Sequence, residues 1–124
     1  MNKEFNCPVE ATISLIGGKY KSVILFHLMG KTLRYSELHK KIPKATDKML
    51  AQQLRELEKD GLIKRTVYPV VPPKTEYNLT EFGESLSPIL NAMCNWGESY
   101  LNIPSQCVER CAAGRHLARR STPL

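Results

Sequence analysis

The proline-rich stretch at residues 69–73 limits the fold more than any other part of the sequence. Proline has no backbone N–H and cannot sit in a central strand, so this stretch is expected to be a loop. The segments on either side of it, residues 62–68 and 74–79, alternate apolar and polar side chains as strands do. The sequence therefore predicts a two-stranded hairpin with a proline-rich tip.

Two short helices joined by a tight turn are predicted just before this hairpin. Ser36 is a suitable N-cap for the first helix, which ends where Pro43 excludes the α conformation from the residue before it. Thr46 is a suitable N-cap for the second helix, and Gly61 a suitable residue to close it. Helix, turn, helix and hairpin in this order indicate an α+β, mainly helical fold, a winged helix-turn-helix with a two-stranded wing.

Further elements are expected on both sides of this unit. Helices are predicted over residues 8–16 and 19–29, with a short strand over residues 32–35. A long helix over residues 81–102 would begin after Thr80, and Pro88 should kink or divide it. We expect residues 1–102 to form one domain, and residues 103–124 a basic, disordered tail.

The net charge of +6 is concentrated in one part of the chain. Residues 19–74 hold 13 Lys and Arg against 5 Asp and Glu, whereas residues 75–102 hold no Lys or Arg and 4 Glu. A contiguous basic excess is typical of a surface that faces a polyanion such as nucleic acid. An ordinary solvated basic surface would give the same composition, so charge alone leaves both readings open.

The helix that starts at Thr46 has the pattern of a DNA-reading helix. Leu50, Leu54 and Leu57 form its expected buried stripe, and basic and amide side chains occupy the opposite face. Lys48, Gln52 and Gln53 are the candidates for base contacts, and Thr46 and Arg55 for phosphate contacts. A solvated amphipathic face is the alternative. The full set of candidate DNA-binding residues is Thr46, Lys48, Met49, Gln52, Gln53, Arg55, Lys74, Arg65 and Ser36.

The last predicted helix carries a sustained apolar face. Its members recur at steps of three and four residues: Phe82, Leu86, Ile89, Met93, Trp96 and Tyr100. So long a face at the end of so small a domain favours a symmetric contact with a second copy, made together with Val9 and Ile13 of the first helix. The alternative is a helix that packs wholly on its own domain.

The ordered motifs between residues 7 and 102 resemble the HxlR-type winged helix-turn-helix regulators. They include Leu15-Ile16-Gly17-Gly18-Lys19, Arg34-Tyr35-Ser36-Glu37-Leu38, Met49-Leu50-Ala51-Gln52-Gln53-Leu54-Arg55-Glu56-Leu57-Glu58, and the wing from Tyr68 to Tyr77. The resemblance implies a bacterial or archaeal dimeric regulator that binds double-stranded operator DNA through the helix after Thr46 and the wing at Lys74. It also implies that repression is the commoner outcome. Tyr20 stands where Trp is more usual in the family.

The position of one cysteine suggests a regulatory role. Cys7 lies where the first helix begins, and helix N-termini favour the thiolate form, so Cys7 is the candidate redox or electrophile sensor. An inert capping residue is the alternative. The chain has no signal peptide or apolar span, so a cytoplasmic protein with reduced thiols is expected, and Cys94 should be a small packed residue.

Neither a cofactor nor a metal is expected. Cys107, Cys111 and His116 offer three possible ligands, but the fourth is missing and the spacing is not that of a zinc finger. The sequence has no phosphate-binding loop and no nucleophile elbow, so we do not expect an enzyme. His27 is expected to be packed, and His39 is expected to be exposed. A winged-helix adaptor that binds protein and no DNA is the first alternative function, and a thiol- or metal-dependent enzyme the second.

Overall fold

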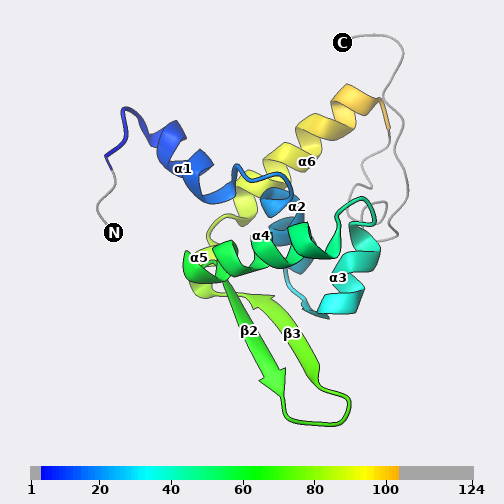
Figure 1. Ribbon diagram of the computed structural model, residues 1–124. Coiled ribbons are helices and arrows are strands. Elements are labelled where there is room, and N and C mark those ends of the chain that lie inside the picture. The colour runs from blue at the N-terminus through cyan, green and yellow to red at the C-terminus, as the bar shows by residue number, and fades with distance from the viewer. Residues whose placement is uncertain (1–3, 104–124) are drawn as a thin grey trace.

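The computed structural model describes residues 4–103. Figure 1 shows a helical body from which a two-stranded wing extends on one side and α1 on another. In chain order the elements are α1 (Pro8–Ile16), α2 (Lys21–Leu28), β1 (Thr32–Arg34), α3 (Tyr35–Lys41), α4 (Asp47–Lys59), β2 (Ile63–Tyr68), β3 (Lys74–Leu79), α5 (Glu81–Glu84) and α6 (Ser87–Leu101). This order confirms the predicted winged helix-turn-helix.

The sheet is antiparallel, with the strand order β1-β3-β2. The wing consists of β2 and β3, paired from Ile63 opposite Leu79 to Tyr68 opposite Lys74. On the other edge of β3, Leu33 of β1 pairs with Tyr77. The sheet therefore anchors the wing to the segment that leads into α3.

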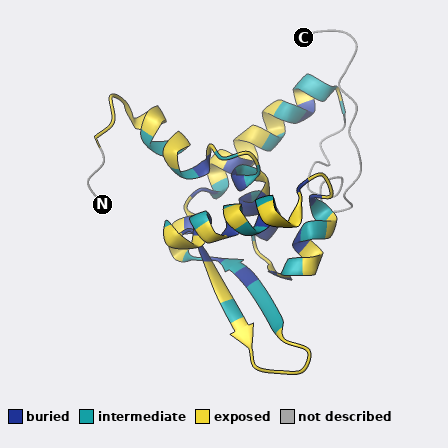
Figure 2. Ribbon diagram, in the orientation of Figure 1, coloured by how far each residue is buried: buried dark blue, intermediate teal, exposed yellow. Residues whose placement is uncertain are grey.

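The core lies between α2, α3, α4 and the base of the sheet. Leu38 of α3 and the predicted α4 stripe are fully or almost fully buried (Figure 2). From α2, Ile24, Leu25 and Leu28 face the same interior, which also holds Leu62 and Ile63 at the start of the wing. Removal of these apolar side chains from water fixes α4 against the body and leaves its other face in solvent.

Side-chain oxygens cap three of the helices, two of them as predicted. The Thr46 hydroxyl accepts from the Met49 backbone N–H (3.1 Å), and the Thr80 hydroxyl accepts from the Gly83 backbone N–H (3.0 Å). The prediction that Ser36 caps α3 is wrong, because α3 begins at Tyr35 and its N-cap is Arg34, two residues earlier than predicted. The Glu37 carboxylate accepts from the Arg34 backbone N–H instead (2.8 Å), so β1 runs directly into α3.

The predicted long C-terminal helix is divided, as Pro88 led us to expect. α5 ends at Glu84, and Pro88 lies in the first turn of α6, where a missing N–H costs nothing. Leu86, at the break, and Leu90, one turn later, are buried in the core. Among the described residues, no helix is both long and apolar enough to cross a membrane.

Candidate nucleic-acid interface

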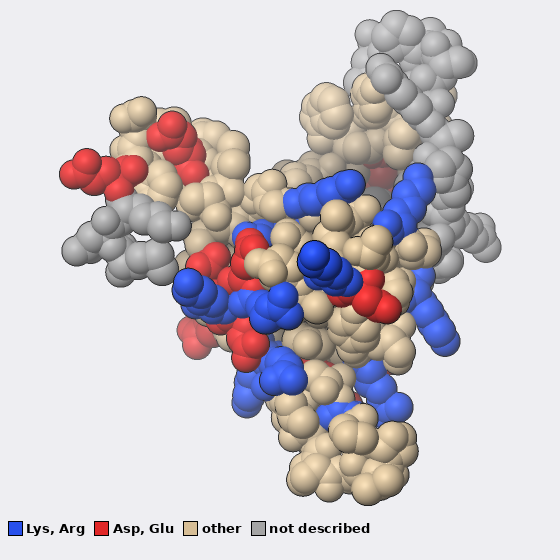
Figure 3. Space-filling view, viewed as in Figure 1, with Lys and Arg blue, Asp and Glu red and all other residues tan. Residues whose placement is uncertain are grey.

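The exposed face of α4 is the centre of the candidate site. Lys48, Gln52 and Arg55 are exposed along it, and Lys59 extends the same face toward the end of the helix. Figure 3 shows Lys and Arg side chains over α4 and around the base of the wing, whereas the tip of the wing shows no charge. The sequence predicted this division of α4, because a helical period of 3.6 residues separates the buried stripe from the polar face.

A chain of polar contacts crosses α4 and reaches α2. Arg55 Nη2 donates to Gln52 Oε1 (2.9 Å), and Gln52 Nε2 donates to Glu56 Oε2 (2.6 Å). The other carboxylate oxygen, Glu56 Oε1, lies 2.7 Å from the ammonium of Lys21 on α2. The hydrogen bond from Gln52 and then the contact with Lys21 hold the pKa of Glu56 below its ordinary value. We call these four residues the α2–α4 polar network; the local sequence pattern does not reveal the contact between Lys21 and Glu56.

Gln53 lies apart from the exposed face, although it was a candidate for base contacts. The residue is half-buried, and its side-chain oxygen is buried without a hydrogen-bond partner among the described residues. A Cβ added at Gly18, in the turn between α1 and α2, would overlap that oxygen. The structure therefore places the carbonyl end of Gln53 against this turn. Met49, also on the flank of the face, is half-buried.

The wing contributes basic side chains near its base. Arg65 on β2 is exposed. The Lys74 ammonium on β3 lies 3.3 Å from the Glu76 carboxylate and 4.9 Å from the centre of the Tyr68 ring. The Glu76 carboxylate and the face of the Tyr68 ring thus hold the Lys74 side chain in place. The carboxylate also offsets part of the positive charge that this side chain presents to solvent.

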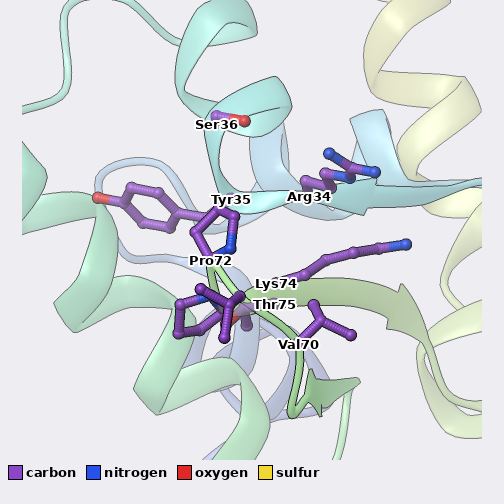
Figure 4. Close-up of a pocket in the computed structure, with 9 residues that line it drawn as sticks. Arg34, Tyr35, Ser36, Val70, Pro72, Lys74 and Thr75 are labelled. Carbon is purple, nitrogen blue, oxygen red and sulfur yellow. The ribbon is translucent and has the colours of Figure 1, made fainter.

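A pocket of about 470 Å³ lies between the wing tip and the start of α3. In Figure 4, Arg34 and Lys74 extend along the same side of it, and Ser36 lies above on the first turn of α3. Val70 and Pro72 form the wall on the wing side. The structure thus brings Ser36 and Lys74, predicted separately from distant parts of the sequence, to one place.

The turn between α3 and α4 is fixed by side chains from both helices. The Tyr35 hydroxyl lies 3.0 Å from Asp47 Oδ1, and burial followed by this hydrogen bond raises the pKa of Tyr35 to about 12. His39 was expected to be exposed, but it is half-buried: its Nε2 lies 3.0 Å from the Ala45 carbonyl oxygen and its Nδ1 3.2 Å from Asp47 Oδ1. These contacts hold α4 at a defined angle to α3.

Comparison with known proteins now identifies the family. The profile of the HxlR-like helix-turn-helix family matches residues 15–105. The chain belongs to the HxlR-like helix-turn-helix family. The transcriptional regulator YdeP of Bacillus subtilis is 54% identical over 94 residues, which span 76% of this chain and 73% of YdeP.

Solved structures agree with this assignment. The redox regulator HypR in its oxidised form matches with a TM-score of 0.72 at 50% identity, over 75% of this chain and 96% of that one. The reduced form of the transcriptional regulator YodB from B. subtilis matches with a TM-score of 0.65 at 35% identity, over 77% of this chain and 95% of that one. The chain is therefore a transcriptional regulator of the helix-turn-helix type, and its relatives are named for that non-enzymatic role.

This HxlR-like regulator has a second notable surface, which is apolar. On α1, Val9 is 64% exposed and Ile13 is also exposed. At the other end of the described chain, Trp96 is 65% exposed and stacks on Tyr100 with 5.5 Å between ring centres. Phe82, Ile89 and Met93 are exposed as well, whereas Leu86 lies in the core of its own chain. The predicted apolar face is thus divided between the core and solvent.

The regulator's cysteines differ from one another in state. Cys7 is an exposed free thiol at the N-cap of α1, and its side chain makes no capping hydrogen bond. Cys94 is half-buried but disulfide-bonded, so the expectation of a reduced, merely packed thiol is wrong. Spacing along the sequence cannot show whether two sulfur atoms approach to bonding distance. The predictions for Cys107, Cys111, His116 and the basic tail concern positions outside the described residues.

Proposed function

We propose that this HxlR-like regulator is a sequence-specific DNA-binding protein that acts as a homodimer on a palindromic operator and represses transcription there. The observation that carries the proposal is the exposed polar face of α4, with Lys48, Gln52 and Arg55 on a helix whose apolar stripe is fixed in the core. A helix presented in this way fits the major groove, where side chains can reach base edges. Such a protein works in the cytoplasm, beside the chromosome.

In this proposal, the wing and the start of α3 bind the sugar-phosphate backbone of the DNA on either side of α4. Arg65 is exposed on β2, and Ser36 lies with Lys74 at the pocket between wing and α3. Contacts from such side chains to phosphates fix the register without reading sequence. In this arrangement the candidate DNA-binding residues are Thr46, Lys48, Met49, Gln52, Gln53 and Arg55 on α4, with Ser36, Arg65 and Lys74 beside it. The buried oxygen of Gln53 makes it the member least suited to reach a base.

Two features support the homodimer. α1 has nine residues, of which only Ile16 is buried, and so short a helix is marginal in water without a packing partner. Its exposed Val9 and Ile13 match in character the exposed Ile89, Met93 and Trp96 of α6. A two-fold contact through these faces would place two α4 helices in successive major grooves, roughly 34–36 Å apart.

Binding to the regulator's own upstream intergenic DNA, measured across a salt series, tests the proposal. Tight binding relative to random duplex, with a steep fall as salt rises, is the expected result, because Lys and Arg displace counterions from phosphates. Lys48→Ala should weaken binding and reduce the salt slope by about one, whereas Lys48→Arg, which keeps the charge, should leave the salt slope unchanged. Binding that is weak, insensitive to salt and equal on random DNA contradicts the proposal and favours the winged-helix adaptor.

We further propose that Cys7 makes the regulator responsive to oxidants or electrophiles. Cys7 is exposed at a helix start, and two solved structures similar to this chain are of regulators in a defined redox state: oxidised HypR and reduced YodB. An accessible thiol there can form a sulfenic acid or a mixed disulfide and shift α1, which carries the expected dimer contact. No other small-molecule effector is assigned.

The sensor proposal is tested by thiol chemistry together with DNA binding. Cys7 should be alkylated faster than a free peptide thiol, and oxidant should release DNA from the wild type and spare a Cys7→Ser variant. Cys94 is already disulfide-bonded and offers no free thiol, so the comparison of the wild type with Cys7→Ser tests Cys7 itself. Equal release from the wild type and Cys7→Ser would remove Cys7 from the mechanism.

A further inference from the structure

Lys21 is a buried cation on α2, the helix whose Ile24, Leu25 and Leu28 enter the apolar core. Apolar packing does not account for a charged side chain at this position. Its side chain is 9% exposed, and its ammonium lies 2.7 Å from Glu56 Oε1. A cation withdrawn from water needs a partner of opposite charge, so Lys21 holds the Glu56 carboxylate in one place. Gly18 leaves room for the stem of Lys21, since a Cβ there would lie 2.8 Å from the Lys21 Cδ. The position of Glu56 is thus set from the α1–α2 turn and α2.

The held carboxylate in turn orients the Gln52 amide. Because a carboxylate only accepts hydrogen bonds, Gln52 must present its NH₂ to Glu56 Oε2 (2.6 Å), which directs its oxygen away from Glu56. That oxygen accepts from Arg55 Nη2 (2.9 Å). The order of contacts, from Lys21 through Glu56 and Gln52 to Arg55, therefore fixes which groups the exposed face of α4 presents.

The groups presented by this network are hydrogen-bond donors. The Gln52 oxygen is engaged by Arg55, whereas the guanidinium of Arg55, an exposed residue, has further N–H groups. An amide needs its oxygen to pair with adenine N6, but a guanidinium pairs through donors alone with guanine O6 and N7. The network therefore favours guanine over adenine opposite this part of α4.

We propose that Lys21 and Glu56 are positioning residues that make Gln52 and Arg55 a guanine-reading pair without touching DNA themselves. This inference rests on the proposed function and refines it, because Arg55 was expected on phosphate. It names the base class read by α4 and gives a specificity role to a side chain buried on a different helix. Loss of Lys21 frees Glu56, Gln52 turns, and Arg55 loses its support.

The test uses the full chain and a duplex selected from a random pool by the wild type. Each guanine of a half-site is replaced in turn by 7-deazaguanine, which lacks the N7 acceptor. The wild type should lose about tenfold in affinity at one position of the half-site, the usual scale for one bidentate base contact. Arg55→Ala should bind the guanine and 7-deazaguanine duplexes with equal affinity at that position. In Lys21→Met and in Glu56→Gln the loss at that position should shrink to about threefold or less.

Lys59→Met is the matched control, because it removes one positive charge from the exposed end of α4 outside the network. It should keep the tenfold guanine penalty, and Lys21→Met should keep the wild-type salt slope, since a buried ammonium releases no counterions. The double variant Lys21→Met with Glu56→Gln should be no worse than either single variant in discrimination, as expected for residues that act in one chain.

Three results overturn the inference. One is a full guanine penalty in Lys21→Met, in Glu56→Gln and in the double variant. The double variant leaves no unpaired buried charge, so it keeps the test valid if a single variant does not fold. Another is tight, specific binding by the wild type with no penalty for 7-deazaguanine at any position, which leaves the proposed function standing. The third is the absence of specific binding to any duplex, which overturns the proposed function as well.

Discussion

At the scale of single residues, a basic side chain that is buried must either pair with an acid or lose its charge. Lys21 and His27 are both buried on α2, whose other residues, apart from Ser22, are apolar. Lys21 has an acidic partner at 2.7 Å, whereas burial is the largest influence on His27. The protein therefore keeps Lys21 charged and paired with Glu56, and keeps His27 uncharged at neutral pH.

His27 gives the protein a pH-dependent stability. Burial, followed by the positive charges of Lys41 and Lys31, lowers its pKa from 6.5 to about 4. The unfolded chain therefore takes up a proton on His27 below pH 6.5, and the folded protein does so only near pH 4. The free energy of unfolding should fall by about 2 kcal/mol between pH 7 and pH 5.

Urea unfolding at the two pH values and at fixed protein concentration measures this fall. His27→Leu lacks the titrating group and should lose most of the difference, which separates His27 from His39. If the wild type has the same stability at pH 7 and pH 5, His27 takes up its proton at pH 5 in the folded protein as well, which contradicts the prediction.

At the scale of elements, the caps and junctions decide where each helix begins and how it meets the sheet. The Thr80 hydroxyl contacts α5 through the Gly83 N–H and the end of α4 through the Gly61 carbonyl oxygen, to which it donates (2.6 Å). Gly61 closes α4 with a φ of +79°, a conformation that favours glycine. One hydroxyl thus joins α4, the wing and α5.

Thr46→Ala should lower the free energy of unfolding by about 1 kcal/mol. The substitution removes the oxygen that accepts from the Met49 N–H and leaves that donor at the start of α4 without its cap. Thr46→Ser keeps the oxygen and should retain most of the stability. Urea denaturation of the three proteins measures the difference, and equal losses in Ala and Ser would assign the effect to the methyl group of Thr46.

Gly83→Ala should be more costly than loss of the cap. A Cβ at Gly83 would overlap the carbonyl oxygen of Leu62, which is backbone and cannot turn aside. Relief requires α5 to move from the sheet, so we expect a loss of about 2 kcal/mol or more in urea unfolding. Gly97 in α6 has no atom within 4 Å of an added Cβ, and Gly97→Ala is the control that should fold at least as stably as the wild type. Similar losses in both variants would contradict the close approach.

At the scale of the whole molecule, the proposed function assigns the basic face to DNA and the apolar faces to a second copy. α4 and the base of the wing carry Lys and Arg, and α1 and α6 carry exposed apolar side chains (Figures 2 and 3). Operator occupancy on this view depends on both surfaces, because two half-sites bind together only if the protomers stay joined.

Trp96→Glu should convert the proposed dimer to a monomer without unfolding the chain. The side chain is 65% exposed, so the charge costs little in a single chain but much in an apolar contact. Sedimentation velocity measures the oligomeric state, and circular dichroism checks the fold. Val71→Glu, at the fully exposed wing tip, also places a charge on an exposed apolar residue and should remain dimeric. A dimeric Trp96→Glu protein would move the contact elsewhere.

The sequence by itself determined the element order, the buried stripe of α4, the Thr46 and Thr80 caps and the hairpin with its proline-rich tip. These follow from local rules, in which the repeat of apolar residues and the positions of Pro, Gly and Thr act over a few neighbours. The same rules placed Lys48, Gln52 and Arg55 on one exposed face.

Only the tertiary structure decided which distant residues meet. It paired β1 with β3, buried Leu86 in the core, turned the Gln53 oxygen toward Gly18 and set Lys21 against Glu56. Nothing in the local pattern links residues 21 and 56, because their contact depends on how α2 packs against α4. Packing of the whole chain brings such charges together, and the cost of burying a cation without a partner keeps them there.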